Sequence, residues 1–335
     1  MDAFEFANPT TLKEAIGLLG SDWEDASVFA GGTDLLALLK DDVEDTKRLV
    51  NIKKVGSLHA VQNVNGGLRI GAAVTIEQLL SASDVRKEFP AITDAAEGVT
   101  SPQIRNMGTV GGDLCQRPRC WYYRAGFGLL ALDKDGKSLP AQGDNRYHAI
   151  FGNDGPAKFV SPSSLAPALI ALGAKLSIEG PKGARETSVE EFFTIPRKEG
   201  EREHALAPNE IVTAIIVPGE SRGMRSATYE IRHKEGLDWP FATASVALRM
   251  KGAAVESARV VLGHVAPKPW PAAEVEKWLA GKSINEETAA KAGDAAAEGA
   301  TPMSRNGYKV QLVRVAVKRA LLAAVRERAA AKGAA

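Results

Sequence analysis

The stretch that decides the expected fold and site is Phe29-Ala30-Gly31-Gly32-Thr33-Asp34-Leu35-Leu36. A second glycine pair with similar flanks follows at Asn106-Met107-Gly108-Thr109-Val110-Gly111-Gly112-Asp113-Leu114. Glycine pairs let the backbone turn with positive φ, and they bring amide N–H groups close to a ligand because no Cβ intervenes. Successive amides of such a turn form a concave anion site, most often for phosphate. We therefore expect the two loops to hold one pyrophosphate, that of a dinucleotide cofactor.

Neither glycine pair matches the better-known phosphate-binding patterns. The chain has no GxxxxGK[ST] sequence, and no GxGxxG between a strand and a helix. An ordinary tight turn is the alternative interpretation of each pair. For Asp34 the alternative is an N-cap of the helix that follows it. The two interpretations are compatible, because a helix N-terminus also favours a nearby phosphate.

Both stretches together resemble the FAD-binding subunit of the molybdenum hydroxylases, the group of xanthine dehydrogenase, carbon monoxide dehydrogenase and aldehyde oxidoreductase. The aldehyde oxidoreductase branch is indicated by two further motifs, QRPRCWYYR at residues 116–124 and NRYHAIFG at residues 145–152. The resemblance covers nearly the whole chain. It implies an α+β fold, with a two-part PCMH-type FAD-binding domain and then a C-terminal domain of a three-stranded sheet with three helices, as in the flavoprotein of carbon monoxide dehydrogenase.

The resemblance also implies which residues bind FAD, chiefly through loop amides on the pyrophosphate. The cofactor-binding residues that it assigns are Phe29, Ala30, Gly31, Gly32, Thr33, Asp34, Leu35, Asn106, Thr109, Gly111, Gly112, Asp113, Ser164 and Val212. In this set Ser164 belongs to the ribose or ribityl end and Val212 lies near the adenine. The residues Trp239-Pro240-Phe241 are expected beside the isoalloxazine. No catalytic acid or base and no metal ligand are expected.

Two positions depart from the family pattern. Asp113 is commonly asparagine in relatives, and a carboxylate cannot donate a hydrogen bond to a phosphate, so we expect it to contact ribose hydroxyls instead. Ser164 stands where many relatives have aspartate. The lost charge-assisted contact is worth roughly 1–3 kcal/mol, so FAD binds more weakly or another residue compensates.

Some members of the aldehyde oxidoreductase branch also bind a [4Fe–4S] cluster, which needs four thiolates. The chain has two cysteines, Cys115 and Cys120, so no such cluster is expected from this chain. Cys120 matches the first ligand position, whereas the later positions fall near Leu129, Leu139 and Phe159. We expect the two cysteines to be buried or partly buried thiols. We expect Leu129, Leu130 and Leu139 to fill the volume that a cluster would take.

Length and composition set the remaining limits. The 335 residues suggest two or three domains, which we place at residues 1–56, 57–220 and 225–330. A net charge of +1, from 42 basic and 41 acidic residues, gives no electrostatic case for nucleic acid or an acidic membrane. No apolar run approaches a bilayer span, and the N-terminus lacks the features of a signal peptide. A cytoplasmic location is expected, with export only as the passenger of a signal-bearing partner.

Periodicity and capping signals predict the elements. Thr10 or Thr11 can cap the first helix, and Thr75 the helix at 76–80. Gly66-Gly67 is predicted to form the turn of a hairpin. In the last helix we expect an apolar stripe to face a core, formed by Val310, Val313, Val317, Leu321 and Val325. Helices are expected at residues 11–19, after residue 34, and at 76–80, 89–99, 165–172, 274–280, 285–298 and 309–330, with a frayed tail after residue 326. Strands are expected at residues 26–29, 48–52, 58–64, 68–72, 159–162, 175–178, 210–218, 226–232, 242–250 and 258–264. Residues 126–141 are expected to leave the sheet, and residues 219–223 to form a linker.

The side chains that follow the second glycine loop allow several interpretations. Arginines alternate with aromatics in the motif at residues 116–124, which fits a partner-binding surface, a wall of the flavin pocket or a self-contained packed loop. His148 is expected to be a hydrogen-bonded core histidine. The other histidines have no metal-ligand spacing.

The implied function is an electron relay. In this family a molybdenum-cofactor subunit oxidises an aldehyde or N-heterocycle, a [2Fe–2S] subunit passes the electrons on, and FAD in this chain gives them to an external acceptor. Two other classes stay open: a stand-alone flavin reductase or oxidase of the same fold, and a flavin-free structural subunit, which Ser164 and Asp113 suggest. A hydrolase is not indicated, because the chain has no G-x-S-x-G elbow.

Overall fold

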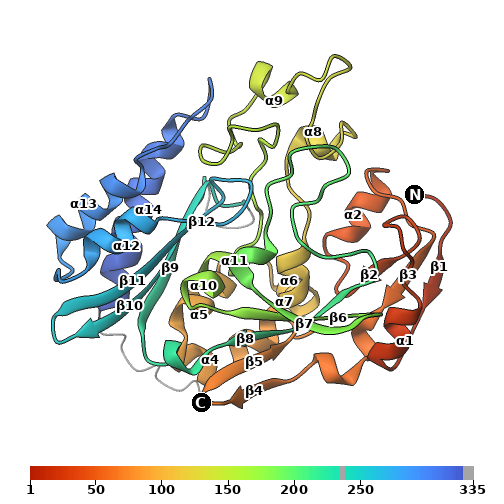
Figure 1. Cartoon of the computed structure of the whole chain (residues 1–335), viewed down its shortest axis with the longest axis horizontal. Helices are drawn as coiled ribbons and strands as arrows, with labels where there is room; N and C mark the ends of the chain where they lie inside the picture. The colour runs from red at the N-terminus through yellow and green to blue at the C-terminus, as the bar shows by residue number, and fades with distance from the viewer. Residues whose placement is uncertain (234–237, 327–335) are drawn as a thin grey trace.

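The computed structural model describes residues 1–233 and 238–326. Within these residues the chain forms three sheets, of three, five and four strands, each with its own helices (Figure 1). This arrangement confirms the α+β class. Among the described residues, no helix combines the length and the apolar character that crossing a membrane requires.

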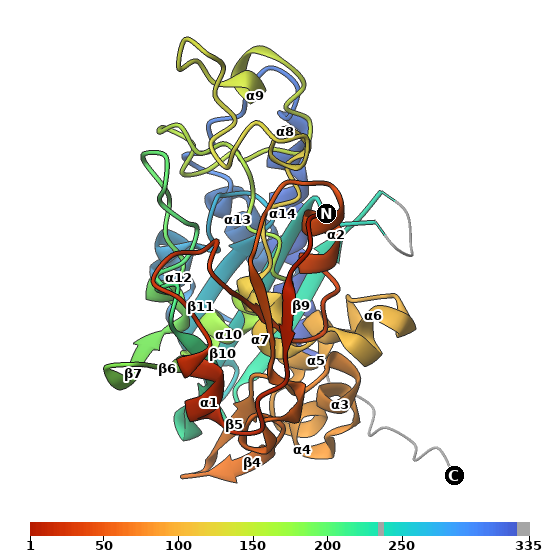
Figure 2. The same cartoon turned by 90° about the vertical axis from the view of Figure 1, so that its right-hand side faces the viewer.

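The first sheet is parallel, with strand order β1-β3-β2. Its strands are β1 (Glu5–Ala7), β2 (Ser27–Phe29) and β3 (Arg48–Asn51), and its helices are α1 (Leu12–Gly17) and α2 (Leu35–Lys40). The predicted cap of α1 is present, because the Thr11 hydroxyl accepts from the Glu14 amide while the Glu14 carboxylate accepts from the Thr11 amide. The first glycine loop therefore starts at the carboxyl end of β2 and leads into α2, where open parallel sheets place their ligands. Figure 2 views the molecule from this side.

The second sheet is antiparallel, with strand order β4-β5-β8-β6-β7. Its strands are β4 (Val61–Val64), β5 (Gly67–Gly71), β6 (Lys175–Gly180), β7 (Gly183–Ser188) and β8 (Ile211–Val217). The short 3₁₀ helices η1 (Ile52–Lys54) and η2 (Gly56–Leu58) lead into it from the first sheet. The predicted turn between β4 and β5 is present and uses positive φ at Asn65 and Gly66, the geometry of a tight hairpin.

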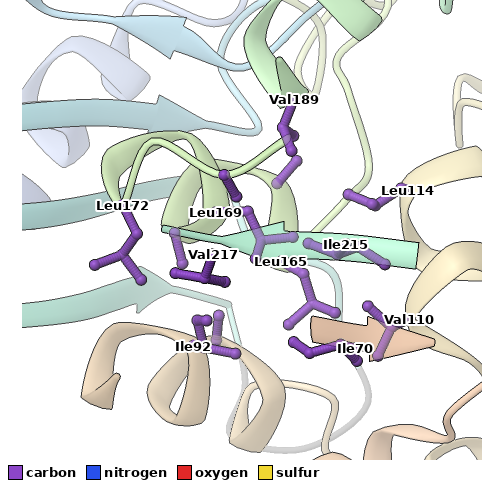
Figure 3. Packing of buried hydrophobic residues seen from close by; sticks show 14 of the residues in the cluster. Ile70, Ile92, Val110, Leu114, Leu165, Leu169, Leu172, Val189, Ile215 and Val217 are labelled. Carbon is purple, nitrogen blue, oxygen red and sulfur yellow. The ribbon is translucent and has the colours of Figure 1, made fainter. Parts of the chain in front are cut away.

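Helices cover this sheet and build the largest core. They are α3 (Ile76–Ser81), α4 (Ser83–Glu88), α5 (Pro90–Glu97), α6 (Pro102–Met107), α7 (Val110–Cys115), α10 (Leu165–Ala171) and α11 (Val189–Phe192). The cap predicted for α3 is present, since Thr75 and Gln78 form a capping box. Figure 3 shows Leu165 and Leu169 of α10 pointing toward Ile215 of β8, with Ile70 of β5 alongside. These side chains are all buried, so α10 is fixed against the sheet.

Residues 116–163, which include the excursion expected at 126–141, leave the sheet and carry only the short helices α8 (Trp121–Arg124) and α9 (Leu139–Gln142). Both views show α8 and α9 at one end of the molecule, away from the sheets (Figures 1 and 2). The strand predicted at residues 159–162 is wrong. These residues form no ladder, because the Ser161 amide donates to Ala266 in a loop and Pro162 has no N–H.

The third sheet is antiparallel, with strand order β12-β11-β10-β9. It consists of β9 (Arg225–Ile231), β10 (Ala242–Lys251), β11 (Ala254–Gly263) and the two-residue strand β12 (Trp270–Pro271), which adds a fourth strand to the three predicted. The expected linker contains a 3₁₀ turn, η3 (Gly219–Ser221). Helices α12 (Ala273–Leu279), α13 (Glu286–Ala296) and α14 (Tyr308–Val325) cover one face, and α5 and α10 lie on the other (Figure 1).

Helix α14 presents the predicted apolar stripe to this core, with Val313, Val317 and Leu321 fully buried. The helix ends at Val325. The predicted continuation to residue 330 and the frayed tail lie outside the described residues.

Candidate cofactor site

The first glycine loop joins β2 to α2 and depends on both of its glycines. Gly32 has a φ of +69°, and a Cβ there would lie 2.5 Å from the Phe29 ring. A Cβ on Gly31 would lie 1.9 Å from the backbone oxygen of Met107, at the end of α6. The two glycine loops therefore touch each other, and the contact requires a residue without a side chain at position 31.

The backbone amides of this loop are available to a ligand. Within the described chain, the N–H groups of Gly31, Gly32, Thr33 and Asp34 donate to no other residue. Thr33 is exposed and its neighbours are half-buried, so these amides border open space. Unpaired backbone donors at the surface of a cavity are suited to an anionic ligand.

The second glycine pair is built differently, and the turn predicted there is wrong. Gly111 and Gly112 have no positive φ and lie in the first turns of α7, which Thr109 caps through its hydroxyl. Its amides are already engaged: Val110 donates to Val74 (2.9 Å), Gly111 to Ala72 (2.9 Å), Gly112 to the Thr109 hydroxyl (3.1 Å) and Asp113 to the Thr109 carbonyl (2.8 Å). Gly111 packs closely on Ala72, and Gly112 lies at the surface. The pair therefore leaves few backbone amides free to donate to a ligand.

The aspartate of the first loop anchors it to the arginine motif. The Asp34 carboxylate accepts from the Arg117 amide (2.7 Å), from the Arg124 guanidinium (2.8 Å) and from the Arg119 guanidinium. It caps no amide of α2, so the predicted N-cap is wrong. The arginine motif is thus a packed loop, and its Arg117 and Arg119 also line cavities of the site.

The aspartate of the second loop holds the start of α10. The Asp113 carboxylate accepts from the Leu165 amide (3.1 Å), from the Gln116 side chain (2.9 Å) and from the Ser163 hydroxyl. Burial raises the pKa of Asp113, although these hydrogen bonds lower it. Protein groups surround this carboxylate, so the expected contact with ribose hydroxyls has little room.

Two cavities meet at the glycine loops. Both are lined by Thr33, Asp34, Thr109, Gly112 and Gln116. We call them the first and the second cavity. An elongated ligand with a polar centre at the loops would extend one end into each.

The first cavity runs beneath α2 toward β8. Its apolar lining includes Val28, Leu38, Ile52, Ile211 and Val212. Its polar wall contains Arg202, whose guanidinium lies 3.9 Å from the centre of the Trp23 ring, and His204. Burial lowers the pKa of His204 to about 4, so this imidazole is neutral at pH 7.

A buried ion-pair network closes this cavity. Arg117 pairs with Glu44 and with Glu203 (2.6 Å), and the side chains of Arg117 and Glu203 are at most 10% exposed. Burial lowers the pKa of Arg117, but the neighbouring carboxylates raise it by more. The pKa of Arg117 therefore lies above its ordinary value. The network fixes the wall on which Trp23 and Arg202 stack. The sequence analysis missed Glu44, Arg202 and Glu203, because their partners lie 73 to 158 residues away.

The second cavity opens beside α6 and reaches the third sheet. It is lined by Val99, Ser101, Ile104, Ser164, Arg232, Trp239 and other residues. The Ser164 hydroxyl bonds to Glu230, and Glu230 pairs with Arg232, which also donates to the Gly98 carbonyl. Burial raises the pKa of Glu230 to about 7 despite the guanidinium. The alternation Glu230-Ile231-Arg232 at the end of β9, which favours both charges on one face, was the signal that could have revealed this pair.

The predicted site residues thus divide into three groups. Ala30, Gly31, Gly32, Thr33, Asp34, Leu35, Thr109, Gly111, Gly112, Asp113, Ser164 and Val212 line one or both cavities. Phe29 lines neither and packs behind Gly32, against Phe6. Asn106 is exposed and donates to the Pro102 carbonyl within α6.

The cysteines show no metal-binding arrangement. Both are free thiols, and burial raises the pKa of Cys115 to about 12. No group of three or more His, Cys, Asp or Glu that could hold a metal occurs in residues 1–233 and 238–326. Leu129, Leu130, Phe159 and Cys120 pack in one apolar cluster, as predicted, but Leu139 lies outside it at the start of α9.

Known proteins share this architecture. Residues 2–220 match the family described as "FAD binding domain in molybdopterin dehydrogenase", and residues 227–324 match "CO dehydrogenase flavoprotein C-terminal domain". The chain belongs to the FAD-binding subunits of the molybdenum hydroxylase family. It is a subunit of an FAD-dependent oxidoreductase, and the predicted fold class is confirmed.

Individual members of this family resemble the chain over most of its length. The carbon monoxide dehydrogenase medium chain of Hydrogenophaga pseudoflava is 29% identical over 325 residues, 96% of each chain. The aldehyde oxidoreductase FAD-binding subunit PaoB of Escherichia coli (strain K12) is 30% identical over 281 residues, 81% of this chain and 84% of the relative. A solved structure of the Hydrogenophaga pseudoflava enzyme, lacking the Mo-pyranopterin moiety, superposes with a TM-score of 0.74 at 28% identity and covers 96% of this chain and 97% of that one.

Proposed function

We propose that this chain is the FAD-binding electron-transfer subunit of a molybdenum-containing hydroxylase that oxidises an aldehyde or N-heterocycle. A [2Fe–2S] subunit would deliver the electrons and a molybdopterin-cofactor subunit would carry the substrate site. The observation that carries the proposal is the meeting of two cavities at the free amides of residues 31–34, in a chain of this family. FAD, when bound, accepts electrons two at a time and releases them to an acceptor.

The site residues take their roles from their positions. The amides of residues 31–34 would hold the diphosphate, with Ala30 and Leu35 shaping the loop on either side. Thr109, Gly111 and Gly112 would let the second loop approach the diphosphate closely, through packing more than through donated hydrogen bonds. Phe29 and Asn106 would act only by supporting the two loops.

The two ends of the cofactor would occupy different surroundings. Val212 and its apolar neighbours in the first cavity suit the adenine, which needs no contact with other redox partners. The second cavity suits the isoalloxazine, because Ile104 and Trp239 beside it are exposed and a redox partner could approach there. Ser164 would face the ribityl end, and Glu230 behind it supplies a carboxyl that compensates for the missing aspartate.

The remaining parts of the proposal concern organisation. We propose domains at residues 1–56, 57–220 and 225–330, and a cytoplasmic location, with export only as the passenger of a signal-bearing partner. No other function is favoured by a specific contact in the described residues.

The test is to purify the native protein gently and to measure its absorption spectrum, its releasable FAD, and its molybdenum and iron. We expect about one FAD per chain and co-purifying molybdenum and iron–sulfur subunits. FAD without those subunits would support a stand-alone flavin reductase or oxidase. The subunits without FAD would support a structural role and contradict the proposal.

A further inference from the structure

A third cavity lies next to the second one, and nothing described above uses it. Its volume is about 390 Å³, within the range of small-molecule sites. It shares Arg119, Asp238, Trp239 and Pro240 with the second cavity, so the two are separated by a single layer of residues. Trp239 is held in this layer by the Arg119 guanidinium, 4.6 Å from the centre of its ring.

The walls of the third cavity are mostly aromatic. Trp121, Tyr147, Phe159, Trp239 and Phe241 line it. Tyr147 and Phe241 stack nearly parallel with their ring centres 5.3 Å apart, and Trp121 meets Tyr147 edge-on at 5.2 Å. Such walls favour a flat, apolar ring system.

The charged groups of this cavity are already engaged. Lys309 donates to the carbonyls of Tyr147 (3.4 Å), His148 (3.2 Å) and His264 (2.7 Å), which matches the three donors of an ammonium. Arg119 pairs with Asp34 and with the Gln116 side chain. The described lining therefore offers no free cation to a phosphate, and Asp238 would repel one.

The buried histidines of the lining are neutral. Both ring nitrogens of His264 are engaged, by the Thr243 hydroxyl at 2.9 Å and the Pro162 carbonyl at 3.3 Å. His148 lies 3.1 Å from the Cys120 sulfur, and burial lowers its pKa to about 4. His233 is exposed and lines the cavity, where its ring can meet a ligand oxygen.

We propose that the third cavity binds a quinone, which serves as the external electron acceptor of this subunit. The inference rests on the proposed function, and it names the acceptor class. In the reaction the quinone takes two electrons and two protons from the reduced flavin, its two carbonyl oxygens become hydroxyls, and the flavin returns to its oxidised form. A nucleotide acceptor is disfavoured, because its phosphates would meet aromatic rings and a carboxylate.

The test uses the native complex and the small quinone 2-methyl-1,4-naphthoquinone as the probe. Binding is measured through quenching of tryptophan fluorescence, since Trp121 and Trp239 line the cavity. We expect saturable quenching that NAD does not reverse. Absence of saturable quenching in a complex that contains FAD, or displacement by NAD, would overturn the inference and leave the proposed function intact. A native complex without FAD would instead contradict the proposed function.

Two variants assign the binding to this cavity. Val160→Phe adds a ring to the half-buried lining residue Val160 and should raise the dissociation constant at least about tenfold, with FAD content unchanged. The matched control is Val64→Phe, the same change at an exposed position of β4, which should leave quinone binding unchanged. Unaltered binding in Val160→Phe, or equal loss in both variants, would overturn the inference.

A third variant covers the case in which Val160→Phe also loses FAD. His233→Leu changes an exposed side chain, so folding and FAD content should be retained. Quinone binding should weaken by about threefold to tenfold, as expected for one lost hydrogen bond. Wild-type quinone affinity in His233→Leu, together with FAD loss in Val160→Phe, would count against the site.

Discussion

The two glycine loops have similar sequences, but their backbone amides differ in whether they bond to the protein. In the first loop Gly32 has positive φ, and the amides of residues 31–34 donate to no other residue among those that the structure describes. In the second loop the glycines are helical, and the amides of residues 110–113 all bond to the protein. The difference follows from Thr109, whose hydroxyl caps α7 and turns the pair into a helix start. A glycine pair therefore marks where chain segments approach closely, but not which loop donates to a ligand.

The aspartates that end the two pairs sharpen the comparison. Asp34 holds three arginine-motif donors, whereas Asp113 holds the start of α10. Each loop is anchored by its acid to a different part of the molecule. The four predictions below test this division of roles, from the largest expected effect to the smallest.

The largest difference is expected between Gly31→Ala and Gly112→Ala. The new Cβ at position 31 meets the Met107 backbone, so this variant should lose at least about 3 kcal/mol of unfolding free energy and its FAD. At position 112 the Cβ meets only the rotatable Thr109 hydroxyl, and the change should stay within about 1 kcal/mol. Urea unfolding and FAD release measure both. Equal losses would show that the loops do not differ in this way.

The next comparison is between Asp34→Asn and Asp113→Asn. Asp34→Asn leaves Arg119 and Arg124 without their carboxylate in a site that is 15% exposed, and should cost about 2–4 kcal/mol. Asp113→Asn should cost less than about 1 kcal/mol, because burial already disfavours this charge and an amide oxygen still accepts from Leu165. Thermal and urea unfolding of the two variants measure these costs. A larger loss of unfolding free energy for Asp113→Asn than for Asp34→Asn would refute the different roles assigned to the two aspartates.

The two cavities should respond to acid in opposite directions. The lowered pKa of His204, about 4 against 6.5, means that stability is lost as pH falls from 6.5 to 4. The raised pKa of Glu230, about 7 against 4.5, means that stability is gained as pH falls from 7 to 4.5. Each full effect is at most about 3 kcal/mol, so they largely cancel in the native chain.

Single variants separate the two contributions. From pH 7 to pH 5, His204→Gln should gain stability relative to the native chain, and Glu230→Gln should lose it. Urea midpoints at several pH values give the comparison. Parallel pH profiles for both variants would show that neither group titrates as stated.

The smallest effect is expected from the threonines. Thr109→Ala removes the cap of Gly112 and should cost about 1 kcal/mol with FAD retained. Thr33→Ala changes an exposed hydroxyl and should leave the unfolding free energy unchanged within about 0.5 kcal/mol. A stability loss for Thr33→Ala that matches Thr109→Ala would contradict the view that the first loop is open to a ligand.

Local signals predicted the parts of the fold that depend on neighbours in sequence. Thr11 and Thr75 were recognised as helix caps because their partners are three residues away. The apolar stripe of α14 was recognised from its spacing alone. The family resemblance supplied the order of the domains, which no local pattern contains.

The failures concern contacts between distant residues. Asp34 looks like a helix cap, but its partners lie 83 to 90 residues along the chain. Strand β7 was missed because its sequence, GARETS, has little apolar alternation, as is common at a sheet edge. The arrangement of Glu230, Ser164 and Arg232 joins different elements, so no sequence window contains it.

Lys309 has a consequence for the independence of the C-terminal part. Its ammonium comes from α14 and is 1% exposed, yet two of its three acceptors, at Tyr147 and His148, belong to the other half of the chain. A fragment cut after the 3₁₀ turn at Gly219–Ser221 would leave the Lys309 side chain with the His264 carbonyl as its one remaining acceptor of these three. The two halves should therefore require co-expression, and reassemble as a split protein, instead of being produced separately.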